Sequence, residues 1–321
     1  MKKNNHINRV VPCEILDETL DEYLNVLGYQ LDYIFPADRP RVAVVFNADE
    51  RIQLGIGDAL KYNVPPVKQT FVHVKLKERD WGKGRAGMYY RDLIPDRQGG
   101  RFIASHIRVP EGGPVADYVH YHRVNFQIIY IYKGWVRVVY EDQGPPFIMN
   151  AGDCVLQPPE IRHRVLECST GFEVVEISCP AEHMTYAEHK MTLPTDHQRP
   201  ERNFNGQRFV NHIGESSKQR PWQLNGYVKE DTGISKATEG LAGVGTVYAE
   251  NPQSSLLSHN GEFYFLFILS GTGILQTDKD HHFSSGDAIV VPMSTGFQIL
   301  DASSDLSFLE VTVPADLHLI Q

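Results

Sequence analysis

The sequence has few cysteines and no long apolar segment. Its 4 cysteines among 321 residues show no Cys-x-x-Cys spacing, so we expect reduced thiols, with a Cys168–Cys179 disulfide as the alternative. No segment approaches the roughly 20 apolar residues that a membrane-spanning helix needs. The first residues also lack the apolar stretch of a secretory signal. We therefore expect a cytoplasmic protein that has no membrane partner.

An excess of positive charge is missing as well. The chain carries 40 acidic and 31 basic residues, a formal net charge of -9 at pH 7, and no lysine- or arginine-rich run. Nucleic-acid-binding proteins need a basic face, so the charge argues against that class. With 41% hydrophobic residues the chain can bury ample core, and its length suggests two or three domains.

Histidines in two short blocks of the sequence are its most informative feature. His120 and His122 are followed after four residues by Gln127, and His163 ends a later block that begins with a glycine. Residues two apart on a strand point to the same face, so His120 and His122 converge while Tyr121 faces away. Imidazoles and an amide oxygen can hold a divalent transition ion and leave positions open for a substrate. We predict one mononuclear metal site with the ligands His120, His122, Gln127 and His163; the alternative is a barrel that keeps histidines without a metal.

The two blocks resemble the paired motifs of the cupin superfamily. Its first motif is a glycine, His-x-His, three or four residues, a glutamate, six residues and a glycine; its second is a glycine and a later Pro-x-Gly-x-x-His. Here Gln127 stands where the family has a carboxylate, and Glu160 stands where it has a turn glycine. The neutral Gln127 leaves a bound ion with more positive charge. A three-histidine site with the Gln127 amide outside the ligand shell is the alternative.

The resemblance implies a jelly-roll barrel, and metal-bearing cupins include dioxygenases, oxidases, isomerases, decarboxylases and binding proteins. A three-histidine site is similar to the ferrous dioxygenase branch, so we expect a dioxygenase-type oxidoreductase that acts on a small organic substrate. The expected cofactor is one divalent transition ion, Fe(II) first, with Mn, Ni, Zn, Cu and Co as alternatives. Alternative functions are a non-catalytic small-molecule or metal-binding protein and a metal-dependent isomerase or lyase. Glu160 and Tyr118 are the candidates for moving a proton.

Two-step alternation also indicates which residues line the pocket. The face that carries His120 also carries Tyr118, and on the next strand the face of Gln127 carries Ile129 and Ile131. We therefore predict Tyr118, Ile129 and Ile131 as pocket-lining residues. A pocket that is part apolar and part aromatic suits a small organic substrate better than a highly charged one.

Residues 241–321 repeat the motif pattern without its ligands. Setting Gly271 against Gly134 aligns the two halves of the chain. The alignment puts Leu257, His259, Tyr264 and Phe297 in the places of His120, His122, Gln127 and His163, respectively. One histidine cannot hold a transition ion at useful affinity, so we predict a second cupin barrel that lacks metal ligands and serves as scaffold.

The N-terminal residues have a different pattern. Apolar residues at helical spacing predict a helix at 18–27, capped by Asp17, and extended runs follow at 29–35, 41–46 and 51–56. With Leu27, Gly28 and Tyr29, this order resembles one βαβββ module of the glyoxalase/bleomycin-resistance group. No His/Glu ligand set lies on these strands, so we expect the module to serve in packing or dimerisation.

Together these patterns predict a mainly β fold, with two cupin (jelly-roll) barrels preceded by a small α+β module. The expected divisions are the module at 1–65, the metal-binding barrel at 66–182, a connector at 183–240 and the second barrel at 241–321. Histidines of the connector, His183 among them, are interpreted as surface residues. Strands 126–132 and 135–141 are expected to pair as a hairpin. The expected partners are a small-molecule substrate and a second copy of the chain in a homodimer, and no nucleic acid.

Overall fold

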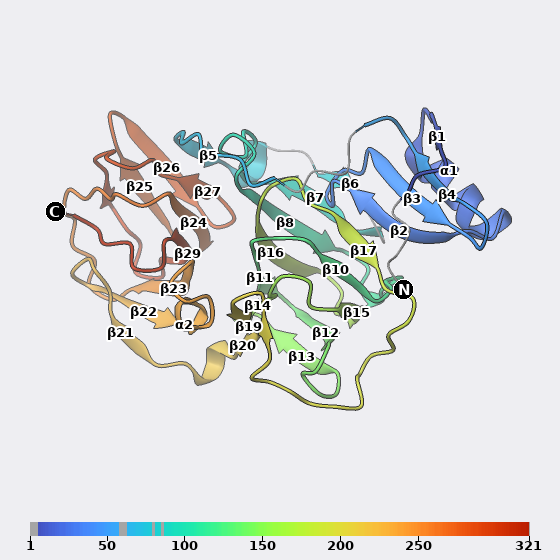
Figure 1. Ribbon diagram of the computed structural model, residues 1–321. Helices are drawn as coiled ribbons and strands as arrows, with labels where there is room; N and C mark the ends of the chain where they lie inside the picture. Colours follow the sequence, from blue (N-terminus) through green and yellow to red (C-terminus); the bar gives the residue numbers. More distant parts are fainter. Residues whose placement is uncertain (1–5, 58–62, 79–80, 85–86, 321) are drawn as a thin grey trace.

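The computed structural model describes residues 6–57, 63–78, 81–84 and 87–320. Residues 1–5, on which the expected lack of a secretory signal partly rests, lie outside these ranges. Figure 1 shows a small blue N-terminal unit (residues 6–57), a central green barrel and an orange-to-red barrel that holds the C-terminus. Within the described residues, no helix is both long and apolar enough to cross a membrane.

The N-terminal unit contains the predicted helix and three strands. Its elements are β1 (Arg9–Val11), α1 (Leu16–Asp21), a helical segment at Glu22–Val26, β2 (Gln30–Phe35), β3 (Val42–Phe46) and β4 (Arg51–Leu54). The strand β1 was not predicted, and it pairs in parallel with β4. The helix begins earlier than expected, because Ile15 rather than Asp17 is the cap residue. Tyr23 and Leu31 pack with the apolar faces of β3 and β4 to form the core of this unit.

One 10-stranded sheet joins this unit to the first barrel. The strand β17 (Thr185–Ala187) pairs with β2 on one side and with β10 (His120–His122) on the other. The sheet continues through β15 (His163–Cys168), β12 (Trp135–Tyr140) and β13 (Phe147–Asn150), while β9 (Gly113–Pro114) also pairs with β15. The N-terminal unit therefore extends the sheet that carries the histidines.

The second sheet of the first barrel has 7 strands. In order these are β20 (Val210–His212), β14 (Cys154–Leu156), β11 (Phe126–Lys133), β16 (Phe172–Cys179), β8 (Ile103–Val109), β7 (Tyr89–Asp92) and β6 (Gly82–Lys83). The expected hairpin is therefore wrong, because β11 and β12 belong to different sheets. Gly134, with a φ of 74°, turns the chain between the sheets, and a Cβ there would clash with the Ser169 side chain.

The second barrel repeats the first. One sheet contains β21 (Gln219–Pro221), β22 (Tyr227–Asp231), β23 (Gly243–Ala249), β29 (Ser307–Val313), β24 (Phe263–Ser270), β27 (Ala288–Val290) and β5 (Val72–Val74). The other contains β26 (Asp280–Ser284), β25 (Thr272–Gln276) and β28 (Gln298–Leu300), and a short helix α2 (Ile234–Ala237) precedes β23. The bridge between Leu257 and Phe297 occupies the place of the His120–His163 pair, as the sequence alignment requires.

The barrels exchange strands. The strand β5 precedes the first barrel in the sequence but pairs with β27 of the second. In turn β20, from the stretch 183–240 that was expected to be a connector, pairs with β14 of the first barrel. That stretch also supplies β17, β21, β22 and the small hairpin of β18 (Asn203–Phe204) and β19 (Gln207–Arg208). It is thus a structural part of both barrels.

The facing sheets of the two barrels share one hydrophobic core. It includes Phe102 and Phe126 of the first barrel and Phe263, Phe265 and Leu309 of the second. The rings of Phe102 and Phe263 stack with their centroids 4.1 Å apart. Burial of this many aromatic side chains fixes the barrels against each other.

Candidate metal centre

Three of the predicted ligands come together on one sheet. His120 and His122 are the ends of β10, and His163 is the first residue of β15, directly opposite His120. One ligand atom from each ring lies within 4.8 Å of the others, and no second such group of His, Cys, Asp and Glu is found in the described part of the chain. His120 and His163 are buried, whereas His122 is half-buried.

The protein holds one nitrogen of each ring. The Nδ1 atoms of His120 and His163 lie 2.8 Å and 3.1 Å from the backbone oxygens of Tyr118 and Ile161. A carbonyl only accepts, so these Nδ1 atoms carry the hydrogen and the Nε2 atoms carry a lone pair. The Nδ1 atom of His122 lies 2.9 Å from the Thr185 hydroxyl. Such partners on the second nitrogen are typical of metal-binding histidines, so the three residues fit a divalent ion.

Gln127 faces this group from β11 of the opposite sheet. It is 1% exposed, and its Nε2 donates a 2.7 Å hydrogen bond to Glu176 on β16. Because a carboxylate accepts, this bond fixes the amide so that its oxygen is the atom turned away from Glu176. Coordination by that oxygen stays a prediction. Glu176 itself was not foreseen, although its counterpart Glu310 stands at the same place of the second barrel.

A cavity of about 130 Å³ lies between the two sheets beside the histidines. It is similar in size to an apolar cavity that holds benzene in another protein. Its polar lining includes the three histidines, Gln127, Gln157, Glu176 and Tyr140, and much of the remaining lining is aliphatic, including Ile103, Ile107, Ile129, Val136, Val138 and Val165.

Of the predicted pocket residues, the structure brings Ile129 to the cavity. Tyr118 is displaced to the core of the N-terminal unit, because β2 and β17 extend the sheet on that side. Ile131 is fully buried in the barrel core, where it packs with residues such as Val155. Tyr118 precedes β10, which begins at His120, so the strand alternation does not reach it. Ile131 lies on the expected strand but outside the lining, since alternation fixes a face and not a depth within the barrel.

His183 also belongs to this cavity. The interpretation of this residue as a surface histidine is wrong, since it is 4% exposed and its ring lies 5.5 Å from that of His122. Burial lowers the pKa of His183, which favours the neutral ring. The backbone N–H of Ala37 donates to the His183 oxygen at 3.0 Å, and Ala37 and Asp38 line the cavity too. The N-terminal unit thus forms part of the cavity wall.

The turn before His163 has an unusual backbone. Glu160 occupies the place of the motif glycine with a φ of 64°, a left-handed conformation that costs most residues about 1–2 kcal/mol. Its N–H donates to the His122 oxygen at 3.1 Å and so ties the turn to β10. Ser294, the counterpart in the second barrel, has a φ of 60° and makes the same bond to His259. The turn geometry therefore explains why the family motif has glycine here.

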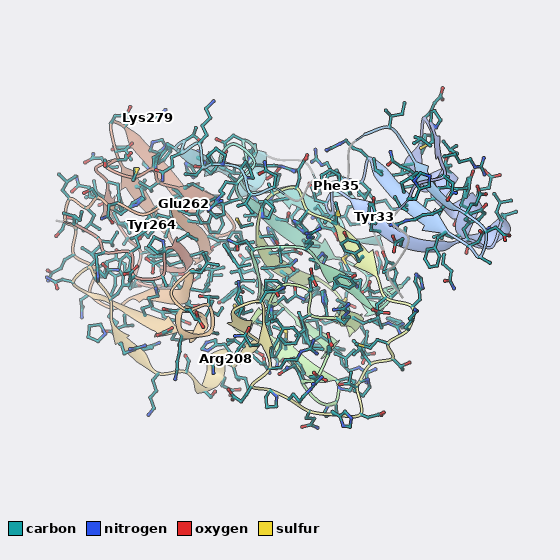
Figure 2. All side chains as sticks on the ribbon, viewed as in Figure 1. Tyr33, Phe35, Arg208, Glu262, Tyr264 and Lys279 are labelled. Carbon is teal, nitrogen blue, oxygen red and sulfur yellow. The ribbon has the colours of Figure 1, made fainter. Side chains whose placement is uncertain are left out.

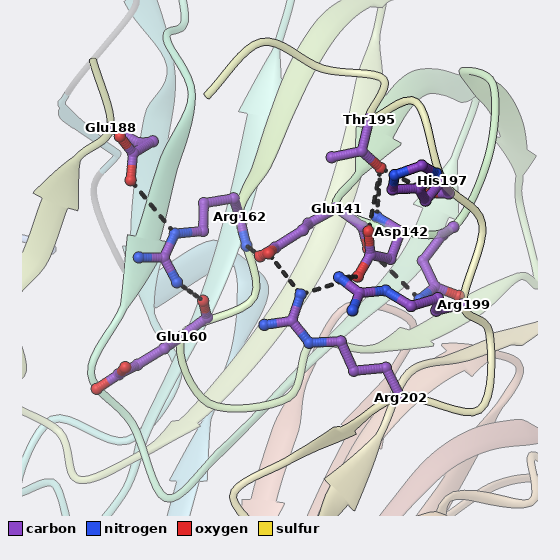
Figure 3. A network of polar contacts seen from close by, with 10 residues as sticks. Glu141, Asp142, Glu160, Arg162, Glu188, Thr195, His197, Arg199 and Arg202 are labelled. Carbon is purple, nitrogen blue, oxygen red and sulfur yellow. Dashed lines mark hydrogen bonds and ion pairs between the residues drawn. The ribbon is translucent and has the colours of Figure 1, made fainter. Parts of the chain in front are cut away.

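A polar network surrounds the same turn (Figure 3). The Arg162 guanidinium donates to the backbone oxygen of Glu160 at 2.9 Å, and it lies 3.5 Å from the Glu188 carboxylate. Its backbone N–H donates to Glu141, which also accepts a 2.6 Å hydrogen bond from Arg202. The contacts hold the turn on both sides and so fix the start of β15, where His163 lies.

The corresponding place in the second barrel is filled by core residues. Leu257, Tyr264 and Phe297 are at most 1% exposed and pack together, and Figure 2 shows Tyr264 among the strands. His259 has its Nε2 2.8 Å from the Val291 oxygen, and its Nδ1 accepts from the N–H of Gly261. Both nitrogens therefore serve the fold, and this side chain has no nitrogen left for an ion.

Comparisons with known proteins bear on the family of this segment and on the fold of the chain. Residues 105–177 match the family described as the cupin domain. This segment is a cupin domain. It contains His120, His122, Gln127 and His163, so the predicted ligand positions all fall inside the cupin match. No curated protein matches the chain in sequence.

Solved structures show that the cupin jelly-roll fold extends over most of the chain. The oxalate decarboxylase of Bacillus subtilis at pH 4.6 has a TM-score of 0.57 at 13% identity, covering 86% of this chain and 87% of that one. The formate complex of the Lactobacillus farciminis oxalate decarboxylase gives 0.57 at 13%, covering 81% and 90%. Protein Ylba from E. coli gives 0.54 at 11%, covering 78% and 94%. Identities this low establish a shared fold only, and the glyoxalase resemblance of the N-terminal unit stays a prediction.

Proposed function

We propose that the chain is a mononuclear metal-dependent enzyme of the dioxygenase type that acts on a small organic substrate. The observation that carries this proposal is the convergence of three histidines, with their Nδ1 atoms occupied, on an internal and mainly apolar cavity. A bound divalent ion, with Fe(II) expected and Mn, Ni, Zn, Cu and Co as alternatives, would polarise substrate oxygens. A redox-active ion such as Fe(II) would also pass electrons from the substrate to dioxygen.

The side chains of the cavity favour a substrate with an apolar body. Ile129, Val136 and the other aliphatic residues offer water no hydrogen-bond partner, which favours its displacement by an apolar substrate. Glu176, held by Gln127, gives the cavity a carboxylate to which a substrate hydroxyl can donate. Glu160 and Tyr118, the earlier candidates for proton transfer, do not line the cavity, so Glu176 takes their place in the proposal.

The charge of the cavity limits the substrate further. Among the described residues that line it there is no lysine or arginine, whereas Asp38 and Glu176 are acidic. A second carboxylate on the substrate would therefore have no cationic side chain to pair with. A neutral or singly charged substrate fits this lining better than a dianion.

A metal-dependent decarboxylase is the second candidate. The specific observation in its favour is the structural similarity to two oxalate decarboxylases, together with the small size of the cavity. The lack of a cation in the described lining counts against a dicarboxylate such as oxalate. This candidate predicts carbon dioxide release without consumption of dioxygen.

Elemental analysis is the first test, on protein purified without chelator or affinity-tag nickel. About one transition ion per chain in the wild type and none in His163→Ala would support the site. A panel of small 2-oxo acids, 2-hydroxy acids, enols and catechols then separates the candidates. Dioxygen uptake supports the dioxygenase, anaerobic carbon dioxide release supports the lyase, and metal binding with neither reaction supports a binding protein.

The homodimer also remains a prediction. Sedimentation velocity tests it.

A further inference from the structure

One buried nitrogen beside the three histidines has no partner in the described part of the fold. The Nε2 atom of His183 has no hydrogen-bond partner among the described residues, although the residue is 4% exposed. A buried polar atom without a partner costs free energy, so such atoms are rare unless a ligand or function accounts for them. His183 lines the cavity beside the three histidines, so the ring that carries this atom lies at the candidate substrate site.

The other nitrogen shows which role Nε2 can play. Nδ1 of His183 lies 3.0 Å from the Pro180 oxygen. A carbonyl accepts only, so Nδ1 carries the hydrogen and the Nε2 atom of the neutral ring presents a lone pair. Nε2 of His183 is therefore able to accept a hydrogen bond from a donor in the cavity beside it.

The position of His183 argues against a fourth ligand. It is not part of the group in which one ligand atom from each of His120, His122 and His163 lies within 4.8 Å of the others. Two residues further on, Thr185 holds Nδ1 of His122. One short segment thus positions a candidate ligand and, next to it, a separate hydrogen-bond acceptor.

The N-terminal unit keeps this acceptor in place. Ala37 donates its N–H to the backbone oxygen of His183 at 3.0 Å, and Asp38, which pairs with Arg97 at 2.6 Å, also lines the cavity. The acceptor is held by the backbone of two units, so little reorganisation is needed when a substrate binds.

We propose that His183 determines substrate specificity by accepting a hydrogen bond from a hydroxyl that neighbours the metal-binding oxygen of the substrate. The proposal rests on the proposed metal-dependent function. It names the substrate class as 2-hydroxy acids and related hydroxy compounds such as enols. A site with a buried acceptor rejects analogues without the donor, because the acceptor then stays unpaired.

The test compares two small anions on the Co²⁺-loaded full-length protein. Glycolate carries the hydroxyl, whereas methoxyacetate keeps the oxygen but lacks the hydrogen. Binding is followed by the visible absorption of the bound Co²⁺ in the wild type, in His183→Leu and in His183→Gln, which retains a polar group near the Nε2 position. Cobalt stoichiometry is measured for all three proteins.

We expect the wild type to bind glycolate about tenfold or more tightly than methoxyacetate. In His183→Leu that ratio falls towards one because glycolate binds more weakly, and His183→Gln restores part of it, with one cobalt per chain throughout. An unchanged glycolate affinity in His183→Leu overturns the proposal. Loss of cobalt in this variant also overturns it, since His183 would then be a ligand.

The same data separate this proposal from the proposed function. If the wild type takes up no cobalt, or if neither anion changes its spectrum, the metal-dependent function fails and the role of His183 fails with it. If glycolate binds to the metal-loaded protein regardless of His183, the metal site stands and the specificity role alone is overturned.

Discussion

Replacing Thr185 with valine removes the hydroxyl that holds a candidate ligand. Its Oγ1 lies 2.9 Å from Nδ1 of His122, and Thr185 is 1% exposed. The partners of His120 and His163 are backbone oxygens, which substitution cannot remove. Valine has nearly the shape of threonine and is favoured in strands, so β17 should keep its pairing with β2 and β10.

The expected magnitude follows from the number of rings affected. Loss of a partner that orients a metal-binding histidine lowers metal affinity by about 10–100-fold. Thr185→Val loosens one of three rings while the other two stay held by carbonyls, so we expect about tenfold, or about 1.4 kcal/mol. The metal-free protein should lose roughly 1 kcal/mol of stability, because one buried hydrogen bond disappears.

Competition with a chromophoric chelator for Zn²⁺ or Co²⁺ measures this affinity. Two controls are matched to the change. Thr185→Ser keeps the hydroxyl, and Thr312→Val makes the same substitution at a buried threonine of the second barrel. The reasoning is refuted if Thr185→Val binds metal as tightly as the wild type, or if Thr312→Val weakens binding equally.

Three further predictions concern other residues of the two barrels. His163→Ala should reduce bound metal to none by elemental analysis, whereas His259→Ala should keep the metal but lose roughly 2–3 kcal/mol of stability in urea, because two buried hydrogen bonds disappear. Burial raises the pKa of Asp142, but hydrogen bonds and charges from Arg202 and Arg199 outweigh it and lower the pKa below its ordinary value of 3.8. A lowered carboxyl pKa stabilises the folded protein above that value, and this stabilisation disappears as the pH falls below it. Asp142→Asn should thus be about 1–3 kcal/mol less stable than the wild type in urea at pH 7. The difference in stability between the two proteins should narrow below pH 3.8. Glu160→Gly should raise the thermal midpoint by relieving the left-handed backbone, a gain of up to about 1 kcal/mol after the entropy of glycine is subtracted; a lower midpoint would contradict the strain argument.

Much of the candidate site could be predicted from the sequence because its signals are local. His120 and His122 are two apart on one strand, and the glycine-led block that ends at His163 has a spacing set by a turn. The repeat could also be aligned, because Leu257 and Phe297 stand at the same separation from Gly271 and Gly286 as the ligands from their glycines. Such patterns need no knowledge of distant contacts.

The rest depends on pairing between distant segments. Alternation shows that 126–132 and 135–141 are strands but not that they lie in different sheets. His183 could have been placed by its own alternation with Thr185 and Ala187, had 183–187 been interpreted as a strand. Glu176 recurs as Glu310 in the second half, at the same distance in the sequence from the glycine that leads the second motif. This recurrence was a further signal of an inward-facing carboxylate.

The exchange of β5 and β20 has a consequence for folding. The second barrel completes a sheet with β5, which lies before the first barrel in the sequence, so no single segment holds the second barrel alone with all of its backbone pairs. The shared core around Phe102 and Phe263 adds to this dependence. The two barrels should therefore unfold as one cooperative unit. An ion bound at the first barrel would then slow amide hydrogen exchange in β24 and β27, even though these strands carry none of its ligands.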